Sequence, residues 1–563
     1  MNSNRHNALS LFAWNTANLR ADSIAGLTVA VLLIPQAMAY ALLAGLPPIT
    51  GLYAALAALP VYALIGTSKQ LQVGPVALDS LLVASGLGVI ALAESQDVIS
   101  MAILLAVMVG LIQIVFGFFR LGFMVNFLAN PVLSGFTSAA AIIIGLSQLG
   151  HILGVTLPVS QQVHHVLGYL LFELQANTIH LPTVFIGLAS LVLLVLMKRW
   201  NPLLPGGLVV MVAGALFVWA FDLPATGMAV VGDIPQGLPT PKIPVFEMDT
   251  LLELFYLALT IAFVSFMESI AVAKKFAAQY RYEVNVNREL VGLGAANVSA
   301  GLFGGYPVAG SFSRTAVNAE AGAKSRMAAF ITTLVIALTL LLFTPLFYYV
   351  PKASLAAVVL VAVVRLLDLE QPRRLLRLGR KDFLLLLFAF FSTLLAGVQS
   401  GILLSILASL LMILSRITRP PSVEFGRVPG TDIFRNLERS EEARQLDGIV
   451  IFRLDSSLYF ANVSYLKDRI YQLIYHRQDD VRCFIIDASS INEIDSSADT
   501  ALFEIAEDFR NSGIELYFTN VKGRVKDFMQ TSGFYEALGD DHFFFSKRDA
   551  VDAFRERQQL TEA

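Results

Sequence analysis

The chain has 563 residues, of which 56% are hydrophobic and only 15% are charged, with a formal net charge of −3. Its mean hydropathy is +0.66. Such a composition excludes an ordinary soluble globular protein and indicates a polytopic membrane protein. The single cysteine, Cys483, excludes an intramolecular disulfide, and its apolar neighbours predict that it lies in a buried strand.

Fourteen apolar segments predict membrane-spanning helices. They cover residues 24–44, 51–65, 75–92, 99–119, 125–149, 181–197, 207–221, 251–273, 288–303, 311–321, 327–348, 354–367, 383–398 and 401–417. Several are shorter than the ~20 residues that a straight crossing needs. We therefore expect broken or tilted helices that pack inside the protein.

The loop charges predict the orientation in the membrane. Most lysines and arginines lie in alternate loops, and only Lys242 and Lys352 fall in loops on the other side. Because cytoplasmic loops carry the excess of Lys and Arg, both termini are expected in the cytoplasm. Residues 1–23 show no cleavage site of a signal peptide and are expected to form a cytoplasmic segment, followed by a transmembrane domain over residues 24–418.

Two segments break the helical pattern at corresponding positions of the two halves, residues 70–80 and 304–316. Each has a short extended run, a break rich in Gly and Pro, and then a helix that starts with small residues. Irregular backbone at this depth must line a protein-enclosed cavity, and paired interrupted segments are typical of the binding site of an inverted-repeat transporter. Two helix N-termini facing one space favour an anion.

The composition changes after Arg419, where charge rises and no further segment could cross a bilayer. Residues 419–434, which include two prolines, are expected to be a stiff linker. Residues 435–555 predict an α/β domain with a partly parallel sheet. Its expected strands are 448–454, 457–460, 481–486 and 514–520, and its expected helices are 463–476, 497–511 and 524–532.

Five motifs resemble those of the SulP family of sulfate permeases and related anion transporters, in the family's order. They are PQAMAYA at 35–41, PPITGLY at 47–53, GPVA at 74–77, FMESIA at 266–271 and GSFSRTAVN at 310–318. The C-terminal domain resembles a STAS domain, with DAS at 487–489 and IDSSA at 494–498. Within the family, the amino-acid sequences of the first and fifth motifs are most similar to those of proton-coupled sulfate transporters.

The resemblance implies a fold of seven plus seven inverted spans in a homodimer. A core domain (spans 1–4 and 8–11) would move against a gate domain (spans 5–7 and 12–14), and the substrate would lie between spans 1 and 8 and half-helices 3 and 10. The candidate substrate-binding residues are Gln36, Tyr40, Val76, Ala77, Ser311, Phe312, Ser313 and Arg314.

Glu268 is the one carboxylate well inside span 8, and an ionisable group at that depth indicates a functional site. Such a group can bind and release a proton and so offset the charge of a dianion. An ion pair with Arg314, or a role as a sodium ligand, remains an alternative.

Arg314 offers a planar fork of donors suited to an oxyanion, or else it binds a neighbouring carboxylate or extends to the cytoplasmic side. Ser311 and Ser313 could donate hydroxyls to the anion, although Ser311 is equally suited to cap the helix. Gln36 and Tyr40 are four residues apart and share a helix face toward a polar cavity or a neighbouring helix.

Asp79 departs from the family, which usually carries an apolar residue there. It is either a second protonation or cation site, or a carboxylate that faces a vestibule. Ser496 and Ser497 match the place where soluble STAS regulators are phosphorylated, although they could simply cap the following helix. His164 and His165 have no further ligand type nearby, so no metal site is expected.

These features predict a secondary anion transporter. The resemblance implies a sulfate:proton symporter that works by elevator-like alternating access, and we expect it in a bacterial plasma membrane. No cofactor, catalytic residue or nucleic-acid partner is expected, because the sequence shows neither a nucleophile motif nor a Walker loop. A sodium-coupled bicarbonate or dicarboxylate transporter, a passive channel or exchanger, and a STAS-centred scaffold with a membrane anchor are the alternatives. A cytoplasmic partner could bind through the STAS domain.

Overall fold

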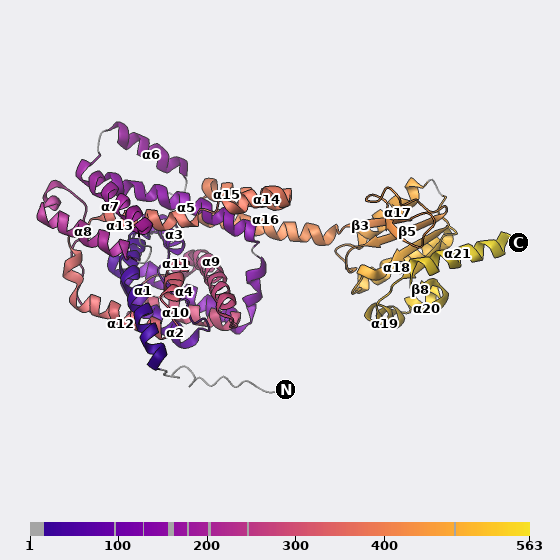
Figure 1. Cartoon of the computed structure of the whole chain (residues 1–563), viewed down its shortest axis with the longest axis horizontal. Helices are drawn as coiled ribbons and strands as arrows, with labels where there is room; N and C mark the ends of the chain where they lie inside the picture. The colour runs from indigo at the N-terminus through magenta and orange to yellow at the C-terminus, as the bar shows by residue number, and fades with distance from the viewer. Residues whose placement is uncertain are drawn as a thin grey trace. The chain divides into compact units, whose positions relative to one another are not determined.

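The computed structural model describes residues 16–94, 97–127, 129–155, 163–176, 179–200, 204–244, 247–477 and 480–562. The chain divides into two compact units, Met1–Ser409 and Leu410–Ala563. The first unit is a bundle of helices, and the second is a sheet covered by helices (Figure 1).

The first unit is built of helices α1 to α16. They are α1 (Thr16–Leu43), α2 (Pro48–Ile65), α3 (Ala77–Glu94), α4 (Val98–Phe118), α5 (Asn130–Leu153), α6 (Val163–Gln175), α7 (Leu181–Trp200), α8 (Gly206–Ala220), α9 (Met248–Tyr280), α10 (Val286–Leu302), α11 (Phe312–Glu320), α12 (Met327–Leu342), α13 (Lys352–Val363), α14 (Glu370–Leu378), α15 (Arg380–Ala396) and α16 (Val398–Thr418). The last of them crosses the boundary between the two units.

Every one of the fourteen expected spans overlaps a helix of the structure. In the part of the chain that the structure describes, seven helices are long and apolar enough to cross a membrane by length and composition. The sequence analysis did not predict α6 and α14. In α14, arginines alternate with leucines, so it lacks the continuous apolar run by which spans are recognised.

The two interrupted segments pair with each other as a short antiparallel sheet. Strand β1 (Val73–Gly74) binds β2 (Ala309–Gly310), with Val73 opposite Gly310 and Gly74 opposite Ala309. Each strand leads within two residues into a helix, α3 or α11, so the N-termini of these helices start from the same small sheet. Antiparallel pairing of corresponding segments is what two repeats of opposite orientation require.

Close packing of α4 against α10 supports the pairing of β1 with β2. Asn297 of α10 donates to Gln113 Oε1 of α4 at 3.0 Å, and its own Oδ1 accepts the backbone N–H of Val308 at 2.7 Å. The segment that leads into β2 is therefore fixed by a buried amide network. The packing is close because glycines face the contact, so a Cβ at Gly294 would lie 2.5 Å from the carbonyl oxygen of Gly110.

The second unit contains a six-stranded sheet in the order β4-β3-β5-β6-β7-β8. Its strands are β3 (Ser422–Arg427), β4 (Phe434–Asn436), β5 (Ile449–Leu454), β6 (Cys483–Asp487), β7 (Glu515–Thr519) and β8 (Phe543–Phe544). The pairs from β5 to β8 are parallel, while β3 is antiparallel to both β4 and β5. The expected partly parallel sheet is thus confirmed.

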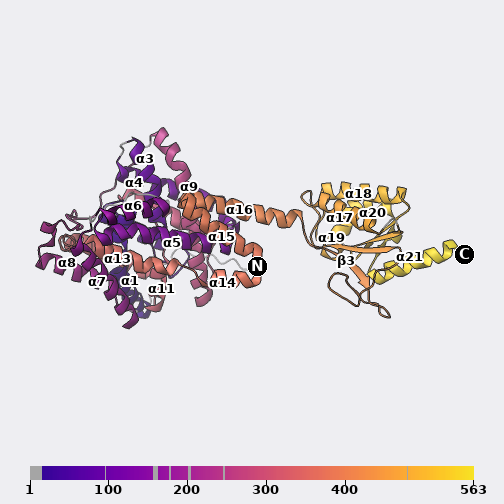
Figure 2. The same ribbon diagram turned by 90° about the horizontal axis from the view of Figure 1, so that it is seen from above.

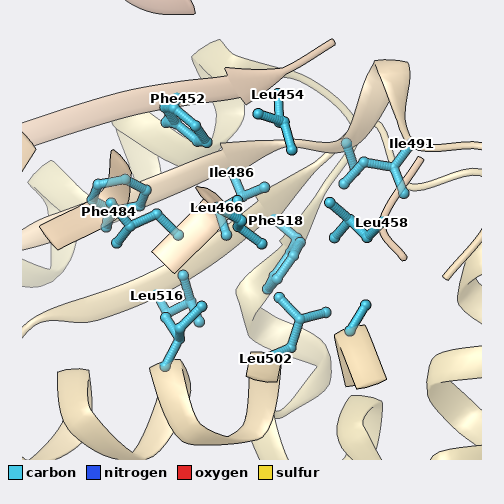
Figure 3. Packing of buried hydrophobic residues seen from close by; sticks show 14 of the residues in the cluster. Phe452, Leu454, Leu458, Leu466, Phe484, Ile486, Ile491, Leu502, Leu516 and Phe518 are labelled. Carbon is cyan, nitrogen blue, oxygen red and sulfur yellow. The ribbon is translucent and has the colours of Figure 1, made fainter. Parts of the chain in front are cut away.

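Alternate residues of the central strands face two different helical layers. Phe452, Phe484 and Phe518 pack with α17 (Val463–His476), α18 (Ser496–Asn511), α19 (Gly523–Ser532) and α20 (Phe534–Leu538) (Figure 3). Their neighbours Ile451, Ile485 and Tyr517 pack with α21 (Lys547–Glu562) on the other face, as the positions of these helices in Figure 2 also show. Cys483 is buried in this second layer, as expected, and burial raises the pKa of its thiol.

Two expectations for this unit are wrong. Residues 457–460 form no strand, because only Leu458 makes an isolated bridge, to Ile494. Part of the expected linker, residues 419–434, belongs to the sheet, since β3 pairs with β5 from Ser422 opposite Leu454 to Phe425 opposite Ile451. The ordered α/β unit therefore includes residues well before 435.

Candidate anion-binding site

A cavity of about 450 Å³ opens at the N-termini of α3 and α11. Its walls include Gln36, Tyr40, Val76, Ala77, Glu268, Ser311, Phe312 and Ser313. The structure therefore brings together every candidate substrate-binding residue except Arg314. The backbone N–H groups of two helix starts and several polar side chains meet in this one space, which is suited to an anion.

The α11 side of the cavity is polar. Ser311 caps α11, its Oγ accepting the backbone N–H of Arg314 at 3.5 Å, and it lies 3.3 Å from Ser313 Oγ. The capping role expected for Ser311 is therefore present. The Ser311 side chain also lines the cavity, so its hydroxyl can donate to a bound ligand while its oxygen caps the helix.

The α1 side supplies an amide and a phenol. Gln36 and Tyr40 both line the cavity, as their spacing predicted, and both are almost completely buried. Gln36 Oε1 has no hydrogen-bond partner among the described residues. A buried polar atom without a partner is costly, so this oxygen is available to a hydrogen-bond donor in the cavity.

Arg314 points away from the cavity. Its side chain is fully buried, and Nη1 donates to the backbone carbonyl of Pro75 at 2.8 Å. The guanidinium thus joins the start of α11 to the segment that leads into α3. The alternative that Arg314 extends to the cytoplasmic surface is wrong, and within the described residues no ion pair joins it to Glu268.

Glu268 of α9 lines two cavities. Besides the first, it lines a second cavity of about 580 Å³ together with Lys275, Arg365 and Arg374. Its Oε2 is buried and has no hydrogen-bond partner in the described part of the chain. Glu268 is close enough to Arg314 for an electrostatic interaction.

The sequence analysis did not identify two cationic side chains that line these cavities. Arg365 lines both cavities, and Lys275 lines the second, where its Nζ lies 4.3 Å from the ring centroid of Phe312. Neither was singled out in the sequence analysis. For Lys275 a signal existed, because it follows Glu268 by two helical turns and so shares its face.

Asp79 lies in the first turn of α3 and is fully buried. Neither carboxylate oxygen has a hydrogen-bond partner among the described residues. The alternative that Asp79 faces a vestibule is therefore wrong.

The paired half-helices are held by residues that the sequence analysis did not single out. Ser269 Oγ accepts the backbone N–H of Gly310 at 2.7 Å, and Thr315 Oγ1 accepts that of Gln72 at 3.1 Å. Asn318 Nδ2 donates to the Gln70 carbonyl at 2.9 Å. These bonds tie α9, α11 and the strand β1 into one body that carries the cavity.

In the STAS unit, Ser496 and Ser497 are exposed in the first turn of α18. The cap of this helix is Asp495, whose Oδ1 accepts the backbone N–H of Ala498 at 2.9 Å. The expectation that the serines cap the helix is therefore wrong. His164 and His165 lie on α6, and the described residues contain no group of three or more potential metal ligands.

Sequence comparisons identify relatives along almost the whole chain. The profile of the sulfate permease family matches residues 19–389, and that of the STAS domain matches residues 441–550. Sulfate transporter 4.1, chloroplastic, of Arabidopsis thaliana is 39% identical over 547 residues, which are 94% of this chain and 79% of that protein. A probable sulfate transporter of Mycobacterium tuberculosis, MT1781, is 35% identical over 539 residues, which are 96% of each protein.

Solved structures agree with these relatives. Murine Solute Carrier 26 family member A9, an anion transporter in the inward-facing state, has a TM-score of 0.88 and 25% identity, covering 97% of this chain and 93% of its own. The transmembrane domain of a cyanobacterial bicarbonate transporter, BicA, has a TM-score of 0.61 and 26% identity, covering 70% of this chain and 98% of its own. The chain therefore belongs to the sulfate permease family as a membrane-embedded, multi-pass anion transporter with a C-terminal STAS domain, and it is not an enzyme.

Proposed function

We propose that this protein is a sulfate:proton symporter that works by elevator-like alternating access. The observation that carries the proposal is the position of Glu268, which has a buried, unpartnered Oε2 and lines the cavity where the two half-helices meet. A carboxyl group beside an anion site can couple the binding of a proton to the binding of the anion.

Sulfate as the substrate is supported by the relatives and by the chemistry of the cavity. Both relatives described above are named sulfate transporters. Sulfate accepts hydrogen bonds at all four oxygens, which suits the amide N–H groups at the starts of α3 and α11, the hydroxyls of Ser311 and Ser313 and the phenol of Tyr40. In this proposal, Val76, Ala77 and Phe312 shape the cavity, and Arg314 raises the local positive potential without touching the ion.

The charge of Glu268 explains why the binding of a proton is coupled to the binding of sulfate. When Glu268 is ionised, its negative charge opposes the entrance of a dianion into the same cavity. Binding a proton removes that charge, so proton and sulfate bind together. On the cytoplasmic side the proton leaves Glu268, and the restored carboxylate then favours release of sulfate.

The moving part would be the core, spans 1–4 and 8–11, which correspond to α1 to α4 and α9 to α12. The bonds that tie β1, α9 and α11 together support movement of this core as one body. The gate would be formed by α5, α7, α8, α13, α15 and α16. We further propose a homodimer, cytoplasmic termini and a location in the plasma membrane, the inner membrane if the source is a bacterium.

The STAS unit would serve assembly or regulation. Exposure of Ser496 and Ser497 supports a role for them as a regulatory site, since a modifying enzyme or a cytoplasmic partner can reach them. Phosphate added at this helix start would be stabilised by the helix N-terminus.

Uptake of labelled sulfate into proteoliposomes tests the function. We expect an inward proton gradient to drive sulfate accumulation equally well with and without sodium. Excess bicarbonate or dicarboxylate should compete weakly. Accumulation driven by sodium, with bicarbonate or a dicarboxylate as the better substrate, would instead establish the second candidate, which the resemblance to the bicarbonate transporter favours. Sulfate current without proton movement would establish a channel or exchanger.

A further inference from the structure

Asp79 is a buried acid that the proposed function leaves without a role. Its side chain is fully buried in the first turn of α3, and both carboxylate oxygens lack a hydrogen-bond partner among the described residues. An ionised carboxylate held without partners in an apolar interior is very costly, whereas the neutral acid is far less so. A residue of this kind inside a membrane domain indicates a function that needs its ionisation to change.

The acid is close to the proposed transport machinery. Leu78, the residue before Asp79, lines both cavities that Glu268 lines. Asp79 itself interacts electrostatically with Glu268 of α9. The next residue, Ser80, shares a hydrogen bond of 3.0 Å with the hydroxyl of Tyr306.

The other titratable and charged groups close to Asp79 are few. Tyr306, from the segment before β2, interacts electrostatically with Asp79, with Arg314 of α11 and with Tyr40 of α1. Arg314 Nη1 donates to the carbonyl of Pro75, while its Nε and Nη2 and both Asp79 carboxylate oxygens have no hydrogen-bond partner among the described residues. Around Asp79 itself, the described charged neighbours are therefore Glu268 and Arg314. The cavities that Glu268 lines also have Lys198, Lys275, Arg365 and Arg374 on their walls, together with Glu320 and Asp368.

The protonation states of Glu268 and Asp79 decide which anions the site accepts. Each of Glu268 and Asp79 that is ionised adds one negative charge, which opposes a dianion. Each proton bound removes one of these charges, so the potential is most favourable to a dianion when both acids are protonated. Two interacting carboxyl groups titrate as a pair, so binding of a dianion favours uptake of protons by both.

We propose that Asp79 is a second proton-binding carboxyl group of the transport cycle, so that sulfate crosses with one proton on Glu268 and another on Asp79. The proposal rests on the proposed function and adds to it a residue and a stoichiometry. Each carboxylate gains one proton and becomes a carboxylic acid on the outside, and each loses that proton to the cytoplasm. Two protons cancel the charge of the dianion, so the transport step moves no net charge.

The test measures the ratio of protons to sulfate in proteoliposomes, from an entrapped pH dye and labelled sulfate, for wild type and Asp79→Asn. We expect the wild type to move about two protons per sulfate and to be indifferent to an imposed membrane potential. The variant should move about one proton fewer, so an inside-negative potential should slow it because net negative charge enters. The matched control is Asp249→Asn, an exposed aspartate in the first turn of α9.

A variant that keeps the wild-type ratio and remains indifferent to voltage overturns the proposal while leaving the symporter intact. If the wild type itself moves no protons, the proposed function fails and the role of Asp79 fails with it. The two failures are therefore distinguishable.

A second measurement does not depend on transport. Addition of sulfate to the purified, weakly buffered protein should cause proton uptake, and this uptake should fall by about half in Asp79→Asn. If the asparagine variant does not fold, Asp79→Leu takes its place, because an apolar side chain satisfies a buried position without charge. Failure of both variants to fold would show that Asp79 is structural, which contradicts the proposal.

Discussion

Arg314 is the residue whose surroundings differ most from its sequence-based interpretation. The sequence analysis expected it to attract the anion, to bind a neighbouring carboxylate or to extend to the cytoplasmic side. In the structure its Nη1 donates to the Pro75 carbonyl and it does not line the cavity. Its charge reaches the site through space, while its hydrogen bond joins the two half-helices.

Replacing Arg314 by glutamine should therefore reduce stability as well as transport. Loss of a hydrogen bond from a charged donor, together with an unsatisfied carbonyl, should lower the free energy of unfolding by roughly 1.5–3 kcal/mol. Thermal unfolding of the detergent-purified variant measures this, with Arg377→Gln, an exposed arginine of α14, as the control. Wild-type stability combined with a raised KM for sulfate would contradict the account and identify Arg314 as a direct ligand.

Asp487 in the STAS unit gives a prediction about pH. Burial acts to raise the pKa of its carboxyl, but the ion pair with Lys547 at 2.6 Å and the hydrogen bonds from Asn520 and Ser489 outweigh burial, so the pKa is lowered. A lowered folded-state pKa stabilises the fold above the unfolded pKa, about 4, and this stabilisation is lost as the pH falls through the folded value.

The isolated STAS unit, which has its own core, is suited to the measurement. Urea unfolding should show Asp487→Asn to be less stable than wild type at pH 7, and the difference should shrink as the pH falls below about 4. Asp527→Asn, at an exposed position of α19, serves as the control and should match wild type throughout. A difference that is constant between pH 7 and pH 3 would exclude the ion pair as its cause.

For single residues, the sequence predicts which face of a helix a side chain occupies but not which neighbour the side chain contacts. The four-residue spacing of Gln36 and Tyr40 placed both on one helix face, and both line the cavity. No spacing could show that Arg314 turns toward Pro75, because that depends on how β1 and β2 pair. Arg365 was missed for a similar reason, since packing between distant helices decides which loop cations face a cavity.

Among the elements, α4 and α10 approach each other closely, and this contact bears on the site. A Cβ at Gly294 would lie 2.5 Å from the carbonyl oxygen of Gly110 and 2.8 Å from the backbone nitrogen of Ile114. Backbone atoms cannot move aside as a flexible side chain can. The contact positions Asn297, which holds the segment before β2.

Gly294→Ala should therefore separate the two helices and destabilise the transmembrane unit by about 1–3 kcal/mol, the usual range for overpacking. Its thermal unfolding temperature should fall, and its sulfate uptake should fall with it. Gly168→Ala on α6 is the control, because a Cβ there meets nothing within 4 Å. An equally stable Gly294 variant would contradict the close packing described here.

Elements with strong local signals were predictable, and those defined by tertiary pairing were not. The fourteen apolar segments all overlap helices, and the STAS helix expected over 463–476 begins and ends where α17 does. Residues 457–460 carry the apolar character of a strand but find only one bridge partner, at Ile494. Strand β3 was overlooked because two prolines precede it, although they end before the first paired residue, Ser422.

For the molecule as a whole, the sequence predicted the architecture because composition, motifs and repeated breaks all agree. The pairing of β1 with β2 gives that architecture its physical basis, since it joins two segments more than two hundred residues apart at one site. Orientation in the bilayer rests on loop charge alone and can be tested separately.

The positive-inside pattern predicts that Lys242 faces outside and Lys381 the cytoplasm. Because Cys483 is the single cysteine, Cys483→Ser gives a background into which Lys242→Cys or Lys381→Cys can be introduced. Both lysines are exposed. A membrane-impermeant maleimide should label the first in intact cells and the second only after lysis; the reverse pattern would invert the topology.

The central claim is that Glu268 couples protons to sulfate, and one comparison tests it most directly. Proteoliposomes with a pH difference of one unit should let the wild type concentrate sulfate about 10-fold for each coupled proton. Glu268→Gln should lose the proton that Glu268 binds, so its accumulation should fall by about 10-fold. It should still exchange external for internal sulfate, because the neutral amide mimics the protonated acid. Glu253→Gln, an exposed residue of the same helix, should behave as wild type. If Glu268→Gln concentrates sulfate as the wild type does, Glu268 does not couple protons to transport and the account is wrong.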